Sequence, residues 1–221
     1  MKKKFLFWSF LFILLTTYNY KGTKNFISEL FIIKEIEIEG VKNSNKNDLQ
    51  VKLEKIKTKN IFFLKERDFD NIIFNVDFVN SLKIKKIYPK KIKITVVEDR
   101  PIGIFFNDQR EKYILLENKK IIKNQNYSFD LPEVQGNGAI DKFSDFYLGL
   151  QKTGLNLKLI KSFVYFDIDR WDLLLEDEKL IKLPPENYEE SVVRFLEIYE
   201  KSNFKKFKVF DFRIKNELIV K

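Results

Sequence analysis

Three aspartates around Trp171, namely Asp167, Asp169 and Asp172, come closer than any other group in this chain to a chemical site. Carboxylates at such spacing can ligate a divalent cation, and a pair of them can act in acid–base hydrolysis. Acidic residues that alternate along a strand, however, more often form its solvated face. We therefore expect these aspartates to be structural.

The residue types on which most enzymes and metal sites depend are missing. The 221 residues include no histidine and no cysteine, which excludes imidazole and thiolate ligands, thiol nucleophiles and disulfides. The 32 acidic residues are accompanied by no G-x-S-x-G motif and no glycine-rich phosphate loop. The sequence thus predicts a protein that is not an enzyme and that needs no metal, cofactor or small-molecule substrate.

The formal charge of +9, from 41 basic against 32 acidic residues, would suit binding to nucleic acid or to an anionic surface. Only six of the basic residues are arginine, the side chain that makes bidentate phosphate contacts, and the lysines are scattered instead of forming one stripe. We expect the charge to serve solvation, with no nucleic-acid partner.

An apolar run follows three lysines at the N-terminus. Residues 5–20, FLFWSFLFILLTTYNY, would span about 24 Å as a helix, against roughly 30 Å for a hydrocarbon core. A signal peptide and an anchor both fit this length, but bulky aromatics stand where a signal peptidase needs small residues. We expect a cytoplasmic leader (1–4), a transmembrane anchor (5–20), a linker (21–31) and a periplasmic remainder. A secreted protein with a cleaved leader is the alternative.

Residues 32–100 show the patterns of a small α+β domain. A strand through Ile36 and Ile38 ends at Gly40, and a helix capped by Asn45 follows. The apolar stripes of this helix and of the next are Leu49, Leu53 and Ile56, and Phe69, Ile72, Ile73 and Val76. Residues 81–101 predict a β-hairpin that turns at 88–90 and ends in a charged exit. The order predicts a three-stranded sheet with two helices on one face.

Residues 101–221 predict a second α+β domain with a mainly antiparallel sheet. Strands are expected at 105–106, 113–116, 120–122, 159–166, 171–175, 180–183, 207–214 and 218–221. One helix is expected around Phe143, Tyr147 and Leu150, another after the prolines at 184–185, and loops at 131–132 and 136–138.

Several segments in order resemble one protein family. The segments IEIEGVKNSNKNDLQ, NIFFL and KIKKIYPKKIKITVVEDRPIGIF look like a POTRA domain of the bacterial FtsQ/DivIB cell-division family. The segments RWDLLLEDEKLIKL, VVRFLEIY and VFDFRIKNELIV resemble the end of the same family, where a tryptophan strand, an R-F helix and a D-L-R strand follow one another. The resemblance covers nearly the whole chain and implies an N-terminal transmembrane helix followed by a POTRA domain and a second α+β domain.

The last strand is the candidate binding site. An unpaired edge strand can take up a partner segment as a further strand, and Leu218, Ile219 and Val220 would form such an edge. The resemblance implies that this strand and the neighbouring helix receive FtsB, which comes with FtsL. Matched by motif, the expected partner-binding residues are Arg170, Arg213, Ile214, Asn216, Leu218, Ile219 and Val220.

A structural interpretation competes for some of these residues. Phe210, Phe212 and Ile214 share one strand face and would normally point inward as core. Asp211 and Arg213 share the other face and can pair with each other, and Arg170 and Arg194 leave the same choice open.

The apolar N-terminal run predicts a bitopic inner-membrane protein, and the resemblance implies a scaffold of the division machinery that is enriched at the septum. By resemblance, it would bring FtsB and FtsL to the septum and help control septal peptidoglycan synthesis by other proteins. The alternative is a POTRA-bearing chaperone or transport component for outer-membrane polypeptides, although a single POTRA without a barrel argues against it.

Overall fold

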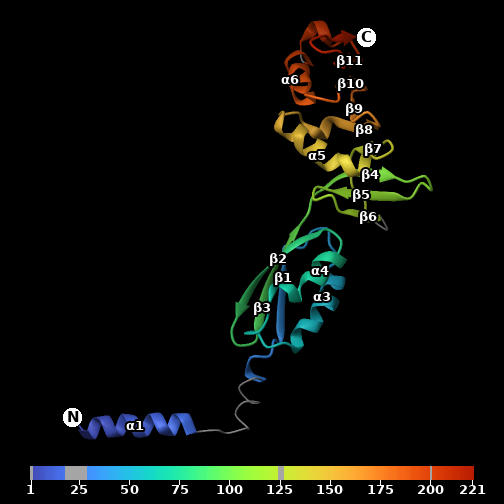
Figure 1. The fold of residues 1–221 in the computed structure, drawn as a ribbon. Coiled ribbons are helices and arrows are strands. Elements are labelled where there is room, and N and C mark those ends of the chain that lie inside the picture. Colours follow the sequence, from blue (N-terminus) through green and yellow to red (C-terminus); the bar gives the residue numbers. More distant parts are fainter. Residues whose placement is uncertain (1, 18–28, 124–126, 200) are drawn as a thin grey trace. The chain divides into compact units, whose positions relative to one another are not determined.

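The computed structural model describes residues 2–17, 29–123, 127–199 and 201–221 (Figure 1). The chain divides into two compact units, Met1–Glu98 and Asp99–Lys221. Helix α1 (Lys2–Thr17) covers residues 5–17 of the predicted anchor, whereas residues 18–20 and most of the predicted linker (21–28) lie outside the described residues. None of the helices in the described ranges combines the length and the apolarity that crossing a bilayer requires.

The first unit contains the predicted three-stranded sheet. Its strands are β1 (Glu35–Glu39), β2 (Val79–Ile87) and β3 (Lys91–Glu98), in the order β1-β3-β2. β3 pairs in parallel with β1 and antiparallel with β2. The β2–β3 turn spans residues 88–90, which confirms the predicted hairpin.

Two helices cover one face of this sheet, as predicted (Figure 1). α3 (Lys46–Glu54) is capped by Asn45, whose side chain accepts hydrogen bonds from two backbone N–H groups of the first turn. Two 3₁₀ helices, Lys55–Thr58 and Glu66–Asp68, lead to α4 (Asp70–Asn75). The apolar stripes of both helices pack with Ile92, Ile94 and Val96 of β3 in one buried core.

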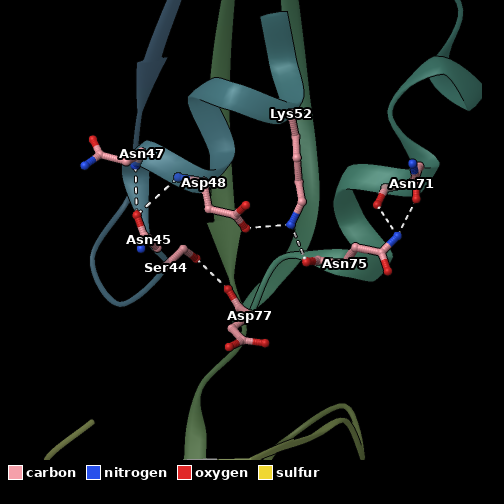
Figure 2. A network of polar contacts seen from close by, with 8 residues as sticks. All are labelled: Ser44, Asn45, Asn47, Asp48, Lys52, Asn71, Asn75 and Asp77. Carbon is pink, nitrogen blue, oxygen red and sulfur yellow. Dashed lines mark hydrogen bonds and ion pairs between the residues drawn. The ribbon is translucent and has the colours of Figure 1, made fainter. Parts of the chain in front are cut away.

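Polar contacts tie the two helices together (Figure 2). Lys52 of α3 donates to Asp48 at 2.6 Å and to the backbone carbonyl of Asn75, at the end of α4, at 2.7 Å. The Ser44 hydroxyl donates to the carbonyl of Asp77 at 2.8 Å. Since Ser44 precedes α3 and Asp77 follows α4, these bonds fix that end of the unit.

The second unit is built on one mixed sheet. Its strands are β4 (Pro101–Phe106), β5 (Lys112–Leu116), β6 (Ile121–Lys123), β7 (Glu133–Gln135), β8 (Ile160–Phe166), β9 (Arg170–Leu175), β10 (Leu180–Lys182), β11 (Val209–Asp211) and β12 (Ile219–Val220). Across the described residues these nine strands follow the order β12-β11-β10-β9-β8-β7-β4-β5-β6. Among the described strands, five pairs are antiparallel and three are parallel.

Helices α5 (Ala139–Lys152) and α6 (Tyr188–Tyr199) pack on one face of this sheet. Aromatic rings dominate their contact with the strands. Phe146 of α5 stacks on Trp171 of β9 at 4.7 Å, and Phe195 of α6 meets Phe210 of β11 edge-on at 5.1 Å. The tryptophan strand and the last two helices therefore form one core with the end of the chain.

The structure adds one strand that was not predicted in this unit and shortens another. The segment after the predicted loop at 131–132 forms β7, which joins the two halves of the sheet through parallel pairs with β4 and β8. The strand predicted at 207–214 is limited to β11, and the chain leaves the sheet after Asp211. As a result, Phe210 and Phe212 are buried, as the core interpretation predicted, whereas Ile214 is 50% exposed. The core interpretation of Ile214 is therefore wrong, and its assignment as a partner-binding residue stays a prediction.

Candidate functional site: an open sheet edge

The C-terminal hairpin ends the nine-stranded sheet. Within the described chain, β12 has β11 as its single neighbour and pairs with it antiparallel. The turn between them is closed by a bond from the Glu217 N–H to the Ile214 carbonyl at 3.1 Å, and Asn216 takes a left-handed conformation there, with φ of 65°. β12 is therefore an edge strand, which is the condition for strand addition.

The register of this hairpin decides which backbone groups face outward. Val209 and Lys221 exchange two backbone hydrogen bonds, of 3.0 and 3.1 Å. Bonded and non-bonded pairs alternate along an antiparallel ladder, and Phe210 and Val220 form the next pair. The N–H and C=O groups of Val220 consequently point away from β11, toward the open edge.

Side chains of the hairpin divide between the two faces of the sheet. Ile219 lies opposite Asp211 and is 40% exposed, on the face that the helices leave open. Leu218 and Val220 are half-buried and pack against the core beneath α6. The edge thus has an apolar side toward the helix and a mixed side toward solvent.

Charged residues line the open face beside this edge. Lys182 of β10 lies opposite Asp172 of β9 on one side and Asp211 of β11 on the other. Arg170 and Asp172 are nearly buried, with side chains 12% and 7% exposed, and Arg170 Nε lies 3.6 Å from Asp172 Oδ1. Neither of these two atoms has a hydrogen-bond partner within the described structure.

Burial raises the pKa of Asp172, and the nearby Arg170, Lys182 and Arg213 oppose that rise without cancelling it. The Arg170 guanidinium also lies over the Phe166 ring, 4.0 Å from its centroid. Arg170 is therefore held by an ion pair and an aromatic ring, and its side chain is mostly inside the protein. The structural interpretation that the sequence left open for Arg170 gains support from this packing.

Asp211 and Arg213 pair with each other, one of the two interpretations that the sequence left open. Arg213 Nε donates to Asp211 Oδ1 at 2.8 Å, and its terminal nitrogen donates to Oδ2 at 2.6 Å. The bidentate contact from Arg213 lowers the pKa of Asp211. Arg213 remains exposed at the surface, close to the open edge.

A hollow of about 250 Å³ adjoins the hairpin turn. It lies between α6 and the segment after β11, and its lining includes Ile214 and Asn216 together with Phe212 and Arg194. The Arg194 guanidinium lies 5.8 Å from the centre of the Phe212 ring. The sequence pointed to Arg194 as one of few arginines and as part of the R-F helix, but no local pattern predicted the hollow, because its two walls lie far apart in the chain.

The structure brings six of the seven predicted partner-binding residues together on the hairpin and its turn: Arg213, Ile214, Asn216, Leu218, Ile219 and Val220. Arg170 lies two strands away, on β9. A larger hollow of about 630 Å³ at the start of β4 includes none of these residues.

Two of the three aspartates around Trp171, Asp169 and Asp172, are engaged in structural contacts. Asp169 accepts a hydrogen bond from the Tyr165 hydroxyl at 2.8 Å and pairs with Lys142 at 3.1 Å, and these two contacts lower its pKa. Asp172 faces Arg170, as described above. In the residues described, no three acidic side chains gather as a metal site would require.

Comparison with known proteins assigns the chain to a family. A model of the C-terminal part of cell division protein FtsQ/DivIB matches residues 104–213. Cell division protein FtsQ of Rickettsia bellii is 28% identical over 193 residues, which make up 86% of this chain and 72% of that protein. The chain belongs to the FtsQ/DivIB family.

Further relatives agree with this assignment and define its reach. Cell division proteins FtsQ of Rickettsia conorii and Rickettsia prowazekii are 27% and 26% identical over the same share of the chain. The family match ends at Arg213, so that the turn and β12 lie beyond it. Membership makes this chain a protein of the bacterial division machinery. The argument that a partner binds at β12 rests on the geometry of the strand, because the family match does not include it.

Proposed function

We propose that this protein is a non-enzymatic scaffold of the divisome that captures FtsB by strand addition to β12. The observation that carries this function is the outward direction of the Val220 backbone groups at an unpaired sheet edge. An extended segment of FtsB would bond to Val220 and extend the sheet beyond β12. FtsL would arrive bound to FtsB.

Side chains around the edge would add specificity to the backbone bonds. Exposed Ile219 and Ile214 offer apolar contacts, and the hollow beside Ile214 and Arg194 can receive a partner side chain. Arg213 places a positive charge at the rim of the edge. Its pairing with Asp211 occupies some of its N–H donors, so that fewer of them are left for a partner. Arg170, being nearly buried, would act by shaping the open face.

The first unit would serve as a POTRA domain, consistent with its three-stranded sheet and two helices. α1 would be the membrane anchor, since its side chains from Phe5 to Leu15 are apolar apart from Ser9, and most are exposed. Residues 1–4 would then lie in the cytoplasm, whereas the sheet and helices of the first unit that follow α1, and the whole second unit, would lie in the periplasm, on the outer side of the inner membrane. Septal peptidoglycan synthesis would be carried out by other proteins that FtsB and FtsL recruit.

A capture experiment tests this function. The full chain, the Leu218→Pro variant and a truncation after Ile214 are each incubated with purified FtsB–FtsL complex of the same organism. We expect both changes to abolish capture while the first unit stays folded, because proline removes a backbone donor only locally. Undiminished capture by a folded variant would contradict strand addition. The anchor is tested separately, by the mass of the chain recovered from membrane fractions.

A further inference from the structure

Exposed aromatic rings gather at one end of the first unit, where β1 begins. Ring centroids of Phe31 and Phe62 lie 4.7 Å apart, and those of Phe62 and Tyr88 lie 5.0 Å apart. Phe62, Phe63 and Tyr88 are 53%, 78% and 54% exposed. Phe31, Phe62 and Tyr88, joined by these ring contacts, and Phe63, which is next to Phe62 in the sequence, are called the aromatic cluster. A contiguous apolar patch of this kind on a folded domain marks a contact site.

Backbone hydrogen bonds hold the cluster in place, although its rings come from three separate segments. Ile61 N–H donates to the Phe31 carbonyl at 2.9 Å, which joins the segment before β1 to the segment after α3. Lys34 N–H donates to the Lys90 carbonyl at 2.8 Å, which joins the start of β1 to the β2–β3 turn. The rings are therefore presented on a fixed backbone.

Lysines stand beside these rings. Lys34, Lys65 and Lys90 lie in the same three segments and form no ion pair within the described residues, whereas Lys59 is paired with Asp68 at 2.5 Å. Exposed acids also lie in these segments: Glu66 in the loop after α3, Glu29 before Phe31, and Glu35 at the start of β1, 3.9 Å from Lys91. Exposed aromatic rings flanked by free ammonium groups match the boundary of a bilayer, where rings enter the headgroup layer and lysines meet lipid phosphates.

The chain itself keeps the cluster near α1. Residues 18–30 separate Thr17 from Phe31, and even a fully extended chain of this length reaches at most about 50 Å. With α1 embedded, this tether would confine the cluster to the neighbourhood of the bilayer and so raise its effective concentration there. This step rests on the anchor in the proposed function.

We propose that the aromatic cluster docks the first unit onto the periplasmic surface of the inner membrane and binds its anionic phospholipids. The contact would orient the first unit relative to the bilayer. It is separate from the edge at β12, which lies in the other unit.

The absence of cysteine permits a direct test in the full chain. Phe63→Cys and Phe74→Cys each introduce one labelling site, at residues of the same type that are 78% and 77% exposed in the same unit. Phe74 is the matched control because it lies at the other end of the first unit, away from the aromatic cluster. It is next to Asn75, at the end where Ser44 contacts Asp77. Each variant carries an environment-sensitive fluorophore and is reconstituted into vesicles of phosphatidylethanolamine and phosphatidylglycerol that contain a nitroxide-labelled lipid.

We expect the label at position 63 to be quenched about threefold more strongly than the label at position 74, because only the cluster enters the headgroup layer. Adding Lys34→Glu and Lys90→Glu should reduce the quenching at position 63 and leave position 74 unchanged. Equal quenching at the two positions in chains that float with the vesicles would overturn the docking site and leave the anchor intact. Chains that do not float with the vesicles would overturn both.

Discussion

Val220 lies opposite Phe210 in a pair whose backbone groups are not bonded to each other. The Phe210 side chain is fully buried against α6, which fixes β11 in the core. The position of β12 is in turn fixed by its pairing with β11. This relationship leaves the last strand of the sheet with an outward donor and acceptor, held in place by that pairing. Rigid presentation lowers the entropy that a partner strand must lose on binding.

Substitutions in the buried pair of Arg170 and Asp172 can show whether the pair contributes to stability or to partner binding. Asp172→Leu alone should lower the free energy of unfolding of the second unit by about 3 kcal/mol, because it leaves a buried guanidinium without its counter-charge. The double variant Arg170→Met/Asp172→Leu should recover most of this loss. Urea unfolding followed by Trp171 fluorescence, in a Trp8→Phe background, measures both.

The same double variant bears on partner binding. If Arg170 acts by shaping the open face, the folded double variant should capture FtsB–FtsL nearly as well as the unmodified chain. A complete loss of capture by a stable double variant would instead make Arg170 a direct contact.

Ile214 should contribute to binding and little to folding. Ile214→Glu places a charge beside the hollow and should weaken FtsB capture about tenfold, while the free energy of unfolding changes by about 0.5 kcal/mol or less. Ile168→Glu is the control, since Ile168 is 66% exposed on the turn between β8 and β9 and lies outside the hollow. Equal losses of affinity in the two variants would exclude the hollow from the interface.

The sequence predicted the first unit well because its signals are local. Ile36 and Ile38 alternate with glutamates, Asn45 caps its helix, and the turn at 88–90 follows from a proline between two alternating runs. Each of these patterns acts over a few residues. β7 escaped prediction because three residues between loops carry no periodicity, and only its pairing with β4 and β8 makes it a strand.

Glu98 predicts a pH dependence in the first unit. Burial alone would raise the pKa of Glu98, but hydrogen bonds from the backbone N–H groups of Ser44, Lys42 and Asn43 outweigh it, so that the pKa lies below its ordinary value of 4.5. A carboxyl group whose pKa is lowered by folding stabilises the fold above its unfolded pKa. This contribution is lost as the pH falls through the lower, folded pKa.

Glu98→Gln should therefore reduce the stability of the first unit by about 1 kcal/mol at pH 7, since the site is partly screened by solvent, and have less effect well below pH 4. Protection factors of the β3 amides, from hydrogen exchange at the two pH values, measure the difference. Glu66→Gln removes the same charge from an exposed side chain and is the control. A Glu98→Gln effect that is the same at both pH values would refute the carboxylate as its source.

Alanine substitutions at two glycines distinguish the cost of a steric clash from the cost of backbone strain. Gly136 has a φ of +113°, and a Cβ added there would lie 2.3 Å from the Tyr165 carbonyl oxygen. Gly154 has a φ of +82°, with no described atom within 4 Å of such a Cβ. Gly136→Ala should cost well over about 2 kcal/mol and Gly154→Ala about 1 kcal/mol, by the same Trp171 measurement. Similar losses of unfolding free energy in the two variants would mean that the strand containing Tyr165 shifts easily to make room for the added Cβ.

The candidate site was only partly predictable. Leu218, Ile219 and Val220 could be recognised as a strand, but whether that strand has a free side depends on the order of all nine strands among the described residues. The core interpretation of Ile214 extended the alternation of Phe210 and Phe212, which the turn at 214–217 interrupts. The hollow beside α6 follows from tertiary packing alone.

The affinity of Val220→Pro for FtsB–FtsL tests strand addition most directly. Proline at position 220 removes the one donor of this residue, which faces outward, and an edge strand tolerates it there. Val220→Ala keeps the donor and removes the packing of the side chain, so it serves as the matched control. In titrations of the full chain, we predict a Kd at least about tenfold weaker for the proline variant and within about threefold of the unmodified chain for the alanine variant. Equal Kd values for a folded proline variant and the unmodified chain would contradict capture at β12.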